Sequence, residues 1–178
     1  HSWSISSFFI KKNSKMIKFI ILIFSLLFYQ KIYASEIVGF PKVVDGDTLH
    51  IESYKIRLEG IDAPEMKQKC KKPYLQIIFF NFQKDYYCGQ VSKKKLVQKI
   101  AQHKVKCTLL GKDRYKRYLA KCFKGKLNLN KWMVRNGYAV AYRKYSKRYI
   151  LEENFAKEEK LGIWIGSFLE PEKWRKQN

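Results

Sequence analysis

The chain has 178 residues, 46% of them hydrophobic and 16% aromatic, which is enough for one domain with a substantial core. Lysine and arginine outnumber aspartate and glutamate by 37 to 15, and the net charge of +22 predicts a polyanionic partner: nucleic acid first, then an anionic membrane or cell-wall polymer. A charge that serves only solubility is the alternative. The four cysteines show no C-x-x-C spacing, which argues against a zinc site and a redox motif.

The first 34 residues are expected to be an N-terminal extension and export signal. Met16 and Lys18 precede an apolar run at 19–29, and Ala34 is a plausible cleavage position. The run is shorter than the roughly 20 residues that span a bilayer. We therefore expect residues 35–178 to form the folded domain, secreted or periplasmic and without stable membrane association after cleavage. An uncleaved signal would anchor the chain in the membrane.

The rest of the chain indicates strands first, then a helix, a hairpin and further helices. Alternating β-branched residues and helical spacing predict strands within 37–51, 54–61, 104–111, 117–125 and 138–142, and helices at about 89–103, 128–136 and 147–161. In the last helix, Ile150, Leu151, Asn154 and Phe155 are expected to face inward. This order indicates an α+β fold with a mainly β core, such as a small closed barrel decorated by helices.

The cysteines are expected to form two disulfides in an oxidising compartment. Of the three possible connectivities, we favour Cys70–Cys88 with Cys107–Cys122. The second pair flanks the predicted hairpin, and the first closes the insert 71–87, where a crosslink stabilises the fold by ~3 kcal/mol in the chain-entropy model.

Acidic residues are concentrated in residues 45–65, which contain six acidic and only two basic residues. The acidic residues are Asp45, Asp47, Glu52, Glu59, Asp62 and Glu65, and the basic ones are Lys55 and Arg57. Asp45 and Asp47 are expected to point to the same side at a strand end, about 6.6 Å apart. That is too far for both to bind one ion directly without a bend, so one is expected to be a ligand and the other an outer-shell group. Asp62 ends another strand. Hard oxygen ligands from two strands, with room for water, suit Ca²⁺ or Mg²⁺.

Two neighbouring side chains complete the parts needed for metal-assisted phosphodiester cleavage. Glu65 follows Asp62 by three residues and can act as general base for an ion-bound water. Arg57 offers a planar fork to phosphate oxygens. The stretches "DGD" and "DAPE" are also good turn sequences, and spacing alone leaves that alternative open.

At "VVDGDT", "RLEGIDAPE" and "DRYKRYLA" the sequence resembles the staphylococcal nuclease family, and the order continues with "LNLNKWMVRNGYA" and "AKEEKLGIW". The resemblance covers roughly residues 38–166. It implies an OB-like five-stranded β-barrel with three helices, and cleavage of DNA and RNA with Ca²⁺ as cofactor.

The resemblance also implies roles for individual residues. Asp47, Asp62 and the backbone carbonyl of Ala63 would be Ca²⁺ ligands, and Asp45 an outer-shell carboxylate. The catalytic residues would be Arg57 for the phosphate, Glu65 as general base, and Arg117 near the leaving 5′-oxygen. Lys116 replaces the glycine that the family usually has before the second arginine, and its side chain can disturb a tight turn or add a phosphate contact.

Aromatic residues next to lysines and arginines indicate further nucleic-acid contacts. Tyr142 and Tyr145 alternate with basic residues, and Arg114 and Tyr115 lie in the predicted hairpin turn. Such pairs suit base stacking and phosphate contact. A solvated loop and helix start explain the same residues equally well.

The sequence therefore predicts a monomeric, exported, Ca²⁺-dependent endonuclease that cuts DNA and RNA at P–O5′ and leaves 3′-phosphate ends. A non-catalytic nucleic-acid-binding module on the same OB-like barrel is the alternative. A basic envelope protein bound to anionic lipid or polymer would explain the charge and none of the motifs.

Overall fold

The protein is represented by a computed structural model that describes residues 16–19, 35–77 and 80–178. The chain divides into two units, residues 1–33 and 34–178. Of the first unit only a short helical segment at residues 16–19 is described, so the predicted signal and its cleavage position at Ala34 lie outside the described residues. Within the described ranges, no helix has both the length and the apolar character needed to cross a membrane.

The second unit has an α+β fold. Its main sheet contains β1 (Glu36–Gly39), β2 (Lys42–Val43), β3 (Thr48–Ile51), β4 (Tyr54–Leu58), β8 (Val105–Lys112), β9 (Tyr118–Lys124) and β10 (Leu127–Asn128). Two smaller sheets pair β5 (Ile61–Asp62) with β11 (Val140–Ala141), and β6 (Lys69–Ile77) with β7 (Phe80–Tyr87). The helices are α2 (Cys88–Ile100), α3 (Leu129–Arg135), α4 (Ile150–Glu158) and α5 (Pro171–Gln177), with the 3₁₀ helix η1 (Gly162–Ile165).

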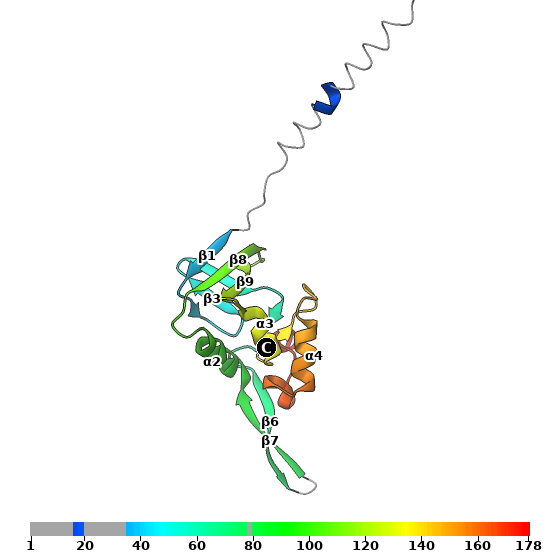
Figure 1. Ribbon diagram of the computed structural model, residues 1–178. Coiled ribbons are helices and arrows are strands. Elements are labelled where there is room, and N and C mark those ends of the chain that lie inside the picture. Colours follow the sequence, from blue (N-terminus) through cyan, green and yellow to red (C-terminus); the bar gives the residue numbers. More distant parts are fainter. Residues whose placement is uncertain (1–15, 20–34, 78–79) are drawn as a thin grey trace, which may run out of the picture. The chain divides into compact units, whose positions relative to one another are not determined.

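The main sheet curls into a half-barrel, as expected for the predicted OB-like fold (Figure 1). Its strands follow the order β1-β8-β9-β4-β3-β2, with β10 added to β9. The pair β4–β9 is parallel and the other pairs are antiparallel. The two-residue strands β2 and β10 extend the sheet beyond the five strands predicted. The predicted α+β class with a mainly β core is confirmed.

Apolar residues that alternate along the strands fill the inside of the half-barrel. Leu49, Ile56 and Leu58 are fully buried and form one cluster with Leu96 of α2 and Met133 of α3. Each such side chain contributes about 1.5–3 kcal/mol when it leaves water. The two helices therefore close the barrel core, and the polar ends of β3, β4 and β5 remain available for a site.

Both predicted disulfides are confirmed. Cys107 and Cys122 occupy directly paired positions of β8 and β9. Cys70 of β6 is joined to Cys88, the first residue of α2. The second bond thus ties the base of the β6–β7 hairpin to the body of the domain.

At the predicted insert, β6 begins two residues before residue 71 and pairs with β7 in a hairpin that extends away from the barrel (Figure 1). Beyond its base, Tyr74, Leu75 and Phe82 are exposed. A two-stranded hairpin is marginally stable by itself. Here the disulfide at its base and a hydrogen bond from the Lys71 amide to the Ser167 carbonyl (2.8 Å) hold it.

The inward face predicted for the helix at 147–161 is partly wrong, although Ile150 packs against the core as predicted. Leu151 of α4 is 78% exposed and Asn154 is exposed, whereas Glu153 is buried. The Glu153 carboxylate accepts the Ala141 amide at 3.0 Å and pairs with Arg143. A carboxylate with such partners can be buried, and hydrophobic spacing cannot reveal this. A further helix, α5, follows and was not predicted.

Candidate active site

Asp45 to Asp47 form a turn between β2 and β3, so the prediction that these acids lie at the end of a strand is wrong. The Asp47 amide donates to Asp45 Oδ1 at 2.9 Å, and this bond closes the turn. A side chain on Gly46 would overlap Ser92 Oγ and Ala63 Cβ. The absence of that side chain lets the turn lie against Ala63, whose amide donates to Asp47 Oδ2 at 3.0 Å.

Arg57 joins the two acids that the sequence placed on different strands. The β3–β4 register sets Arg57 opposite Thr48, which follows Asp47. One terminal nitrogen of the guanidinium donates to Asp47 Oδ1 at 2.7 Å, and the other donates to Asp62 Oδ1 at 3.0 Å. The predicted meeting of Asp47, Arg57 and Asp62 is therefore present in the structure.

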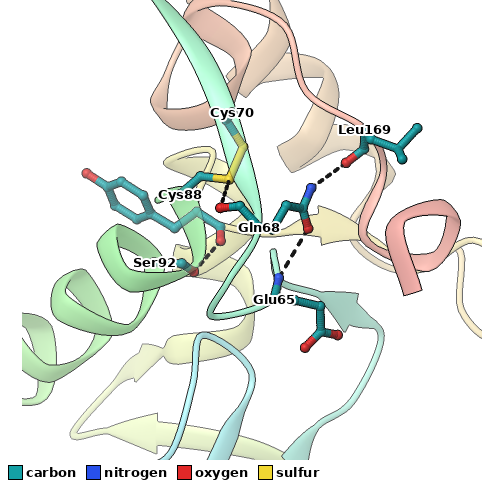
Figure 2. Close-up of a disulfide and its surroundings, with 7 residues drawn as sticks. Glu65, Gln68, Cys70, Cys88, Ser92 and Leu169 are labelled. Carbon is teal, nitrogen blue, oxygen red and sulfur yellow. Dashed lines mark hydrogen bonds between the residues drawn. A yellow bond between two sulfur atoms is a disulfide. The ribbon is translucent and has the colours of Figure 1, made fainter. Parts of the chain in front are cut away.

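The loop after Asp62 brings Glu65 to the same side. Gln68 is fully buried and fixes this loop through two hydrogen bonds. Its backbone amide donates to the Glu65 carbonyl at 2.8 Å. Its side-chain Oε1 accepts the Glu65 backbone amide at 3.2 Å (Figure 2). The helix start at Gly89 lies so close that a side chain there would overlap the Glu65 carbonyl oxygen. The Glu65 carboxylate itself remains partly exposed, as a group acting on substrate requires.

Arg175 of α5 is a site residue that the sequence analysis did not identify. Its two terminal nitrogens donate to Asp62 Oδ1 at 3.0 Å and Oδ2 at 2.8 Å, and one of them also donates to Glu65 Oε1 at 2.8 Å. Pro171 after an acidic residue was a signal for a helix start. No sequence signal, however, links Arg175 to an acid 113 positions earlier.

Two of the carboxylates have raised pKa values. Burial and the nearby Asp47 carboxylate raise the pKa of Asp45 to about 6. Burial also raises the pKa of Asp62, although hydrogen bonding and charge from Arg175, and the charge of Arg57, act in the opposite direction. Both shifts express the cost of holding negative charge away from water. A positive partner would relieve that cost.

The cluster fits a hard divalent cation. No group of three or more His, Cys, Asp or Glu side chains in the described part of the chain is arranged to hold a metal by itself. Asp47 and Asp62 nevertheless offer carboxylate oxygens, the ligand type that Ca²⁺ prefers, and Ca²⁺ can complete its shell with carbonyls and water. When ionised, the four acids (Asp45, Asp47, Asp62 and Glu65) exceed Arg57 and Arg175 by two negative charges. One dication would balance that excess.

Arg117 lies in the β8–β9 turn and is held there by Asp113. Its Nε and a terminal nitrogen each lie 2.8 Å from Asp113 Oδ2. Among the described residues no hydrogen bond or ion pair joins Arg117 to the acidic cluster. The preceding Lys116 has φ +62°, a backbone conformation that favours glycine. The turn thus keeps the backbone form that a glycine would adopt most easily.

The predicted nucleic-acid contacts fall in two places. Arg114 lies 4.9 Å from the ring centre of the exposed Tyr115 in the β8–β9 turn. Tyr142 borders the acidic cluster, because the Arg57 guanidinium lies 5.9 Å from its ring centre, and Tyr145 packs edge-on against it at 4.8 Å. Burial and the Asp62 charge raise the pKa of the Tyr142 hydroxyl. Tyr142 and the exposed Tyr145 therefore form an aromatic rim beside the site.

Comparison with known proteins identifies the fold family. Residues 55–166 match the family described as staphylococcal nuclease homologue. An "Uncharacterized endonuclease" of Haemophilus influenzae is 36% identical over 144 residues, which cover 76% of this chain and 71% of the relative. The "Succinoglycan biosynthesis protein ExoI" of Rhizobium meliloti is 33% identical over 135 residues, covering 74% and 66% respectively. The "Probable staphylococcal-like nuclease CAN4" of Oryza sativa is 30% identical over 134 residues, covering 74% of this chain and 23% of the relative.

The family match, the half-barrel and the acidic cluster agree with the resemblance found in the sequence motifs. The matched region includes Arg57, Asp62, Glu65 and Arg117, and it ends before α5. This chain belongs to the staphylococcal nuclease family.

Proposed function

We propose that this protein is a Ca²⁺-dependent endonuclease that hydrolyses phosphodiester bonds of DNA and RNA at P–O5′ and leaves 3′-phosphate ends. The observation that carries this proposal is the joining of Asp47 and Asp62 by the one guanidinium of Arg57, with Glu65 linked to Asp62 through Arg175. Membership of a nuclease family and the names of the endonuclease relatives support it.

Asp47, Asp62 and the Ala63 carbonyl would hold the Ca²⁺ ion, with Asp45 in its outer shell. The bound ion would supply positive charge to the phosphate and a water of lowered pKa. Asp45 already accepts the Asp47 amide, so it supports the ligand turn from behind. The hydrogen bond to Asp45 thus keeps Asp47 oriented in the ion-free protein.

Arg57 has the capacity to bind the substrate as well as the acids. In the part of the chain that the structure describes, three of its five N–H groups have partners: Asp47, Asp62 and the Ile61 carbonyl at 3.3 Å. The other donors are available for a phosphate oxygen. A preorganised donor of this kind stabilises the charge that develops on the phosphate during in-line attack, an effect commonly of about 10²–10³ in rate.

Glu65 would accept the proton of the attacking water. Its loop is fixed by buried Gln68, so the carboxylate is presented on a rigid support while remaining partly exposed. Arg117 would stabilise the leaving 5′-oxygen. The Tyr142–Tyr145 rim is suited to stacking of a base next to the phosphate held by Arg57.

We further propose that the protein is exported to the periplasm or the medium and acts there as a monomer. The N-terminal sequence has the composition of an export signal, and both disulfides join residues of one chain.

Replacement of Glu65 by glutamine tests the catalytic role. The shape of the side chain is kept while its basicity is lost, so we expect cleavage to fall by about 10²–10⁴-fold. The measurement is digestion of plasmid DNA and of a structured RNA in Ca²⁺ and in EGTA, with analysis of the product termini. Wild-type protein should cut both only with Ca²⁺ and leave 3′-phosphates.

Unimpaired cleavage by Glu65→Gln, or equal cleavage in EGTA, would contradict this mechanism. Binding of nucleic acid by the wild type without any cleavage would favour the non-catalytic binding module. Exposed Lys67 supplies a matched control, because Lys67→Gln changes the same loop without touching a carboxylate of the cluster.

A further inference from the structure

Arg175 occupies carboxylate oxygens that the proposed Ca²⁺ site would use. It donates to both oxygens of Asp62 and to Glu65 Oε1, with distances of 2.8–3.0 Å. It also lies outside residues 55–166, the region that matches the family.

The segment that carries Arg175 is anchored beside the site. Gln68 Nε2 donates to the Leu169 carbonyl at 2.6 Å, while the Oε1 of the same side chain accepts the Glu65 amide (Figure 2). The Lys71 amide also donates to the Ser167 carbonyl at 2.8 Å. These bonds hold the chain just before α5 against the loop of Glu65. They thus position the start of α5, and with it Arg175, near the acids.

The acceptor sites on Asp62 are nearly all used. A carboxylate has about four lone-pair positions. Among the described residues, Asp62 Oδ1 accepts from Arg57 and Arg175 and Oδ2 accepts from Arg175, which leaves one position. The Asp62 side chain is 1% exposed, so water does little to weaken the attraction between these charges. A cation that binds Asp62 must share or take the oxygens that Arg175 holds.

Charge gives a second reason for competition. A guanidinium this close to the ligands of a dication repels it, and in a poorly hydrated site the repulsion is only weakly screened. In the absence of the ion, the same guanidinium is favourable, because it compensates for the buried Asp62 carboxylate. Arg175 therefore stabilises the ion-free cluster and opposes the ion-bound one.

We propose that Arg175 competes with the divalent cation for Asp62 and Glu65 and thereby sets the affinity of the site for the ion. This inference rests on the proposed function, since it concerns the same metal site. Because linkage is reciprocal, an ion that displaces the guanidinium weakens the attachment of α5 to the same extent. Attachment of α5 through Arg175 thus lowers the affinity of the site for the divalent cation.

Isothermal titration of Ca²⁺ into the full chain, without substrate, tests the competition. We compare the wild type with Arg175→Gln, Arg175→Lys and Lys176→Gln. Removal of the competing charge should lower the Kd for Ca²⁺ by about tenfold or more in Arg175→Gln. Arg175→Lys should give a smaller decrease, because lysine keeps the charge but lacks the planar fork that bridges two carboxylates.

Lys176→Gln is the matched control, because it removes one positive charge from the neighbouring position of α5. The Lys176 side chain is 72% exposed and pairs with Glu172. We expect its Kd to change less than about twofold, since an exposed charge is screened by solvent. If Arg175→Gln proves unstable, the comparison of Arg175→Lys with Lys176→Gln decides the matter.

An unchanged or weaker Ca²⁺ affinity in Arg175→Gln would overturn the proposal, and so would an equal change in Lys176→Gln, which would indicate a bulk charge effect. In those cases Ca²⁺-dependent cleavage by the wild type would leave the proposed function standing. A wild type that neither binds Ca²⁺ nor cleaves would overturn the proposed function and this inference together.

Discussion

Arg57 contacts both Asp47 and Asp62 from a side chain that is 13% exposed, and the acids themselves are almost completely buried. Two buried carboxylates repel each other unless a positive group lies between them. In the ion-free protein that group is Arg57, assisted at Asp62 by Arg175. The arginine predicted to bind phosphate therefore also has a structural role, and the two roles can be measured separately.

Replacing Arg57 with methionine, which is uncharged and also unbranched, should destabilise the ion-free protein by about 3–5 kcal/mol, because it leaves buried charges without a partner. Ca²⁺ bound to the same acids should restore part of the loss, so its addition should raise the Tm of Arg57→Met more than that of the wild type. Thermal and denaturant unfolding with and without Ca²⁺ provide the measurement.

The exposed turn residue Arg114 supplies the control for this experiment, and Arg114→Met should change the unfolding free energy by no more than about 0.5 kcal/mol. An Arg57→Met variant as stable as the wild type without Ca²⁺ would show that the acids do not need the bridge.

At the scale of elements, turns and short connections place the functional groups. The turn at 45–47 and the loop at 62–68 supply the acids, and the β8–β9 turn carries Arg117. That last turn is closed by the Asp113 carboxylate, which accepts the amides of Tyr115 and Arg117 at 2.9 and 3.0 Å. Lys116 lies between these two residues with a positive φ.

Lys116→Gly should increase the unfolding free energy by up to about 1 kcal/mol. A residue with a Cβ pays roughly 1–2 kcal/mol in the left-handed region, and glycine avoids that cost while losing some entropy on folding. Urea unfolding at neutral pH measures the difference. Lys121→Gly within β9 is the control and should destabilise by about 0.5–1 kcal/mol. Equal destabilisation by both substitutions would mean that the turn is not strained.

For the whole molecule, the net charge is +22, whereas the four acids of the site outnumber its two arginines. In the proposed function, the long-range positive field would attract the polyanion, and the acids would hold the cation that acts on it. Attraction of the substrate would then depend on the basic residues, and binding of the metal on the acidic ones.

Binding of nucleic acid should therefore depend steeply on salt. For the Glu65→Gln variant with duplex DNA in Ca²⁺, we expect log Kd to rise with log salt with a slope of at least about 4, which corresponds to four or more phosphate contacts. Fluorescence anisotropy between 50 and 300 mM salt (roughly the useful range) measures the slope. A slope near zero would support the alternative that the charge serves only solubility.

The local parts of this protein can be predicted from the amino-acid sequence. The half-barrel strands follow from alternating apolar residues, and the acids and Arg57 lie within 21 consecutive residues, so adjacent strands and turns are enough to bring them together. The pairing Cys107–Cys122 follows from the same short-range logic, since a hairpin aligns its two strands.

Contacts between groups that are distant in the sequence became known only from the fold. Arg175 reaches Asp62 across 113 positions, and Arg117 is bound by Asp113 instead of the acids. Glu153 of α4 is buried, whereas Leu151, which periodicity assigned to the inward face, is exposed, because the partners of Glu153 come from another segment. Contacts of this kind depend on how elements pack, and a packing contact between remote polar side chains leaves no periodic pattern along the chain.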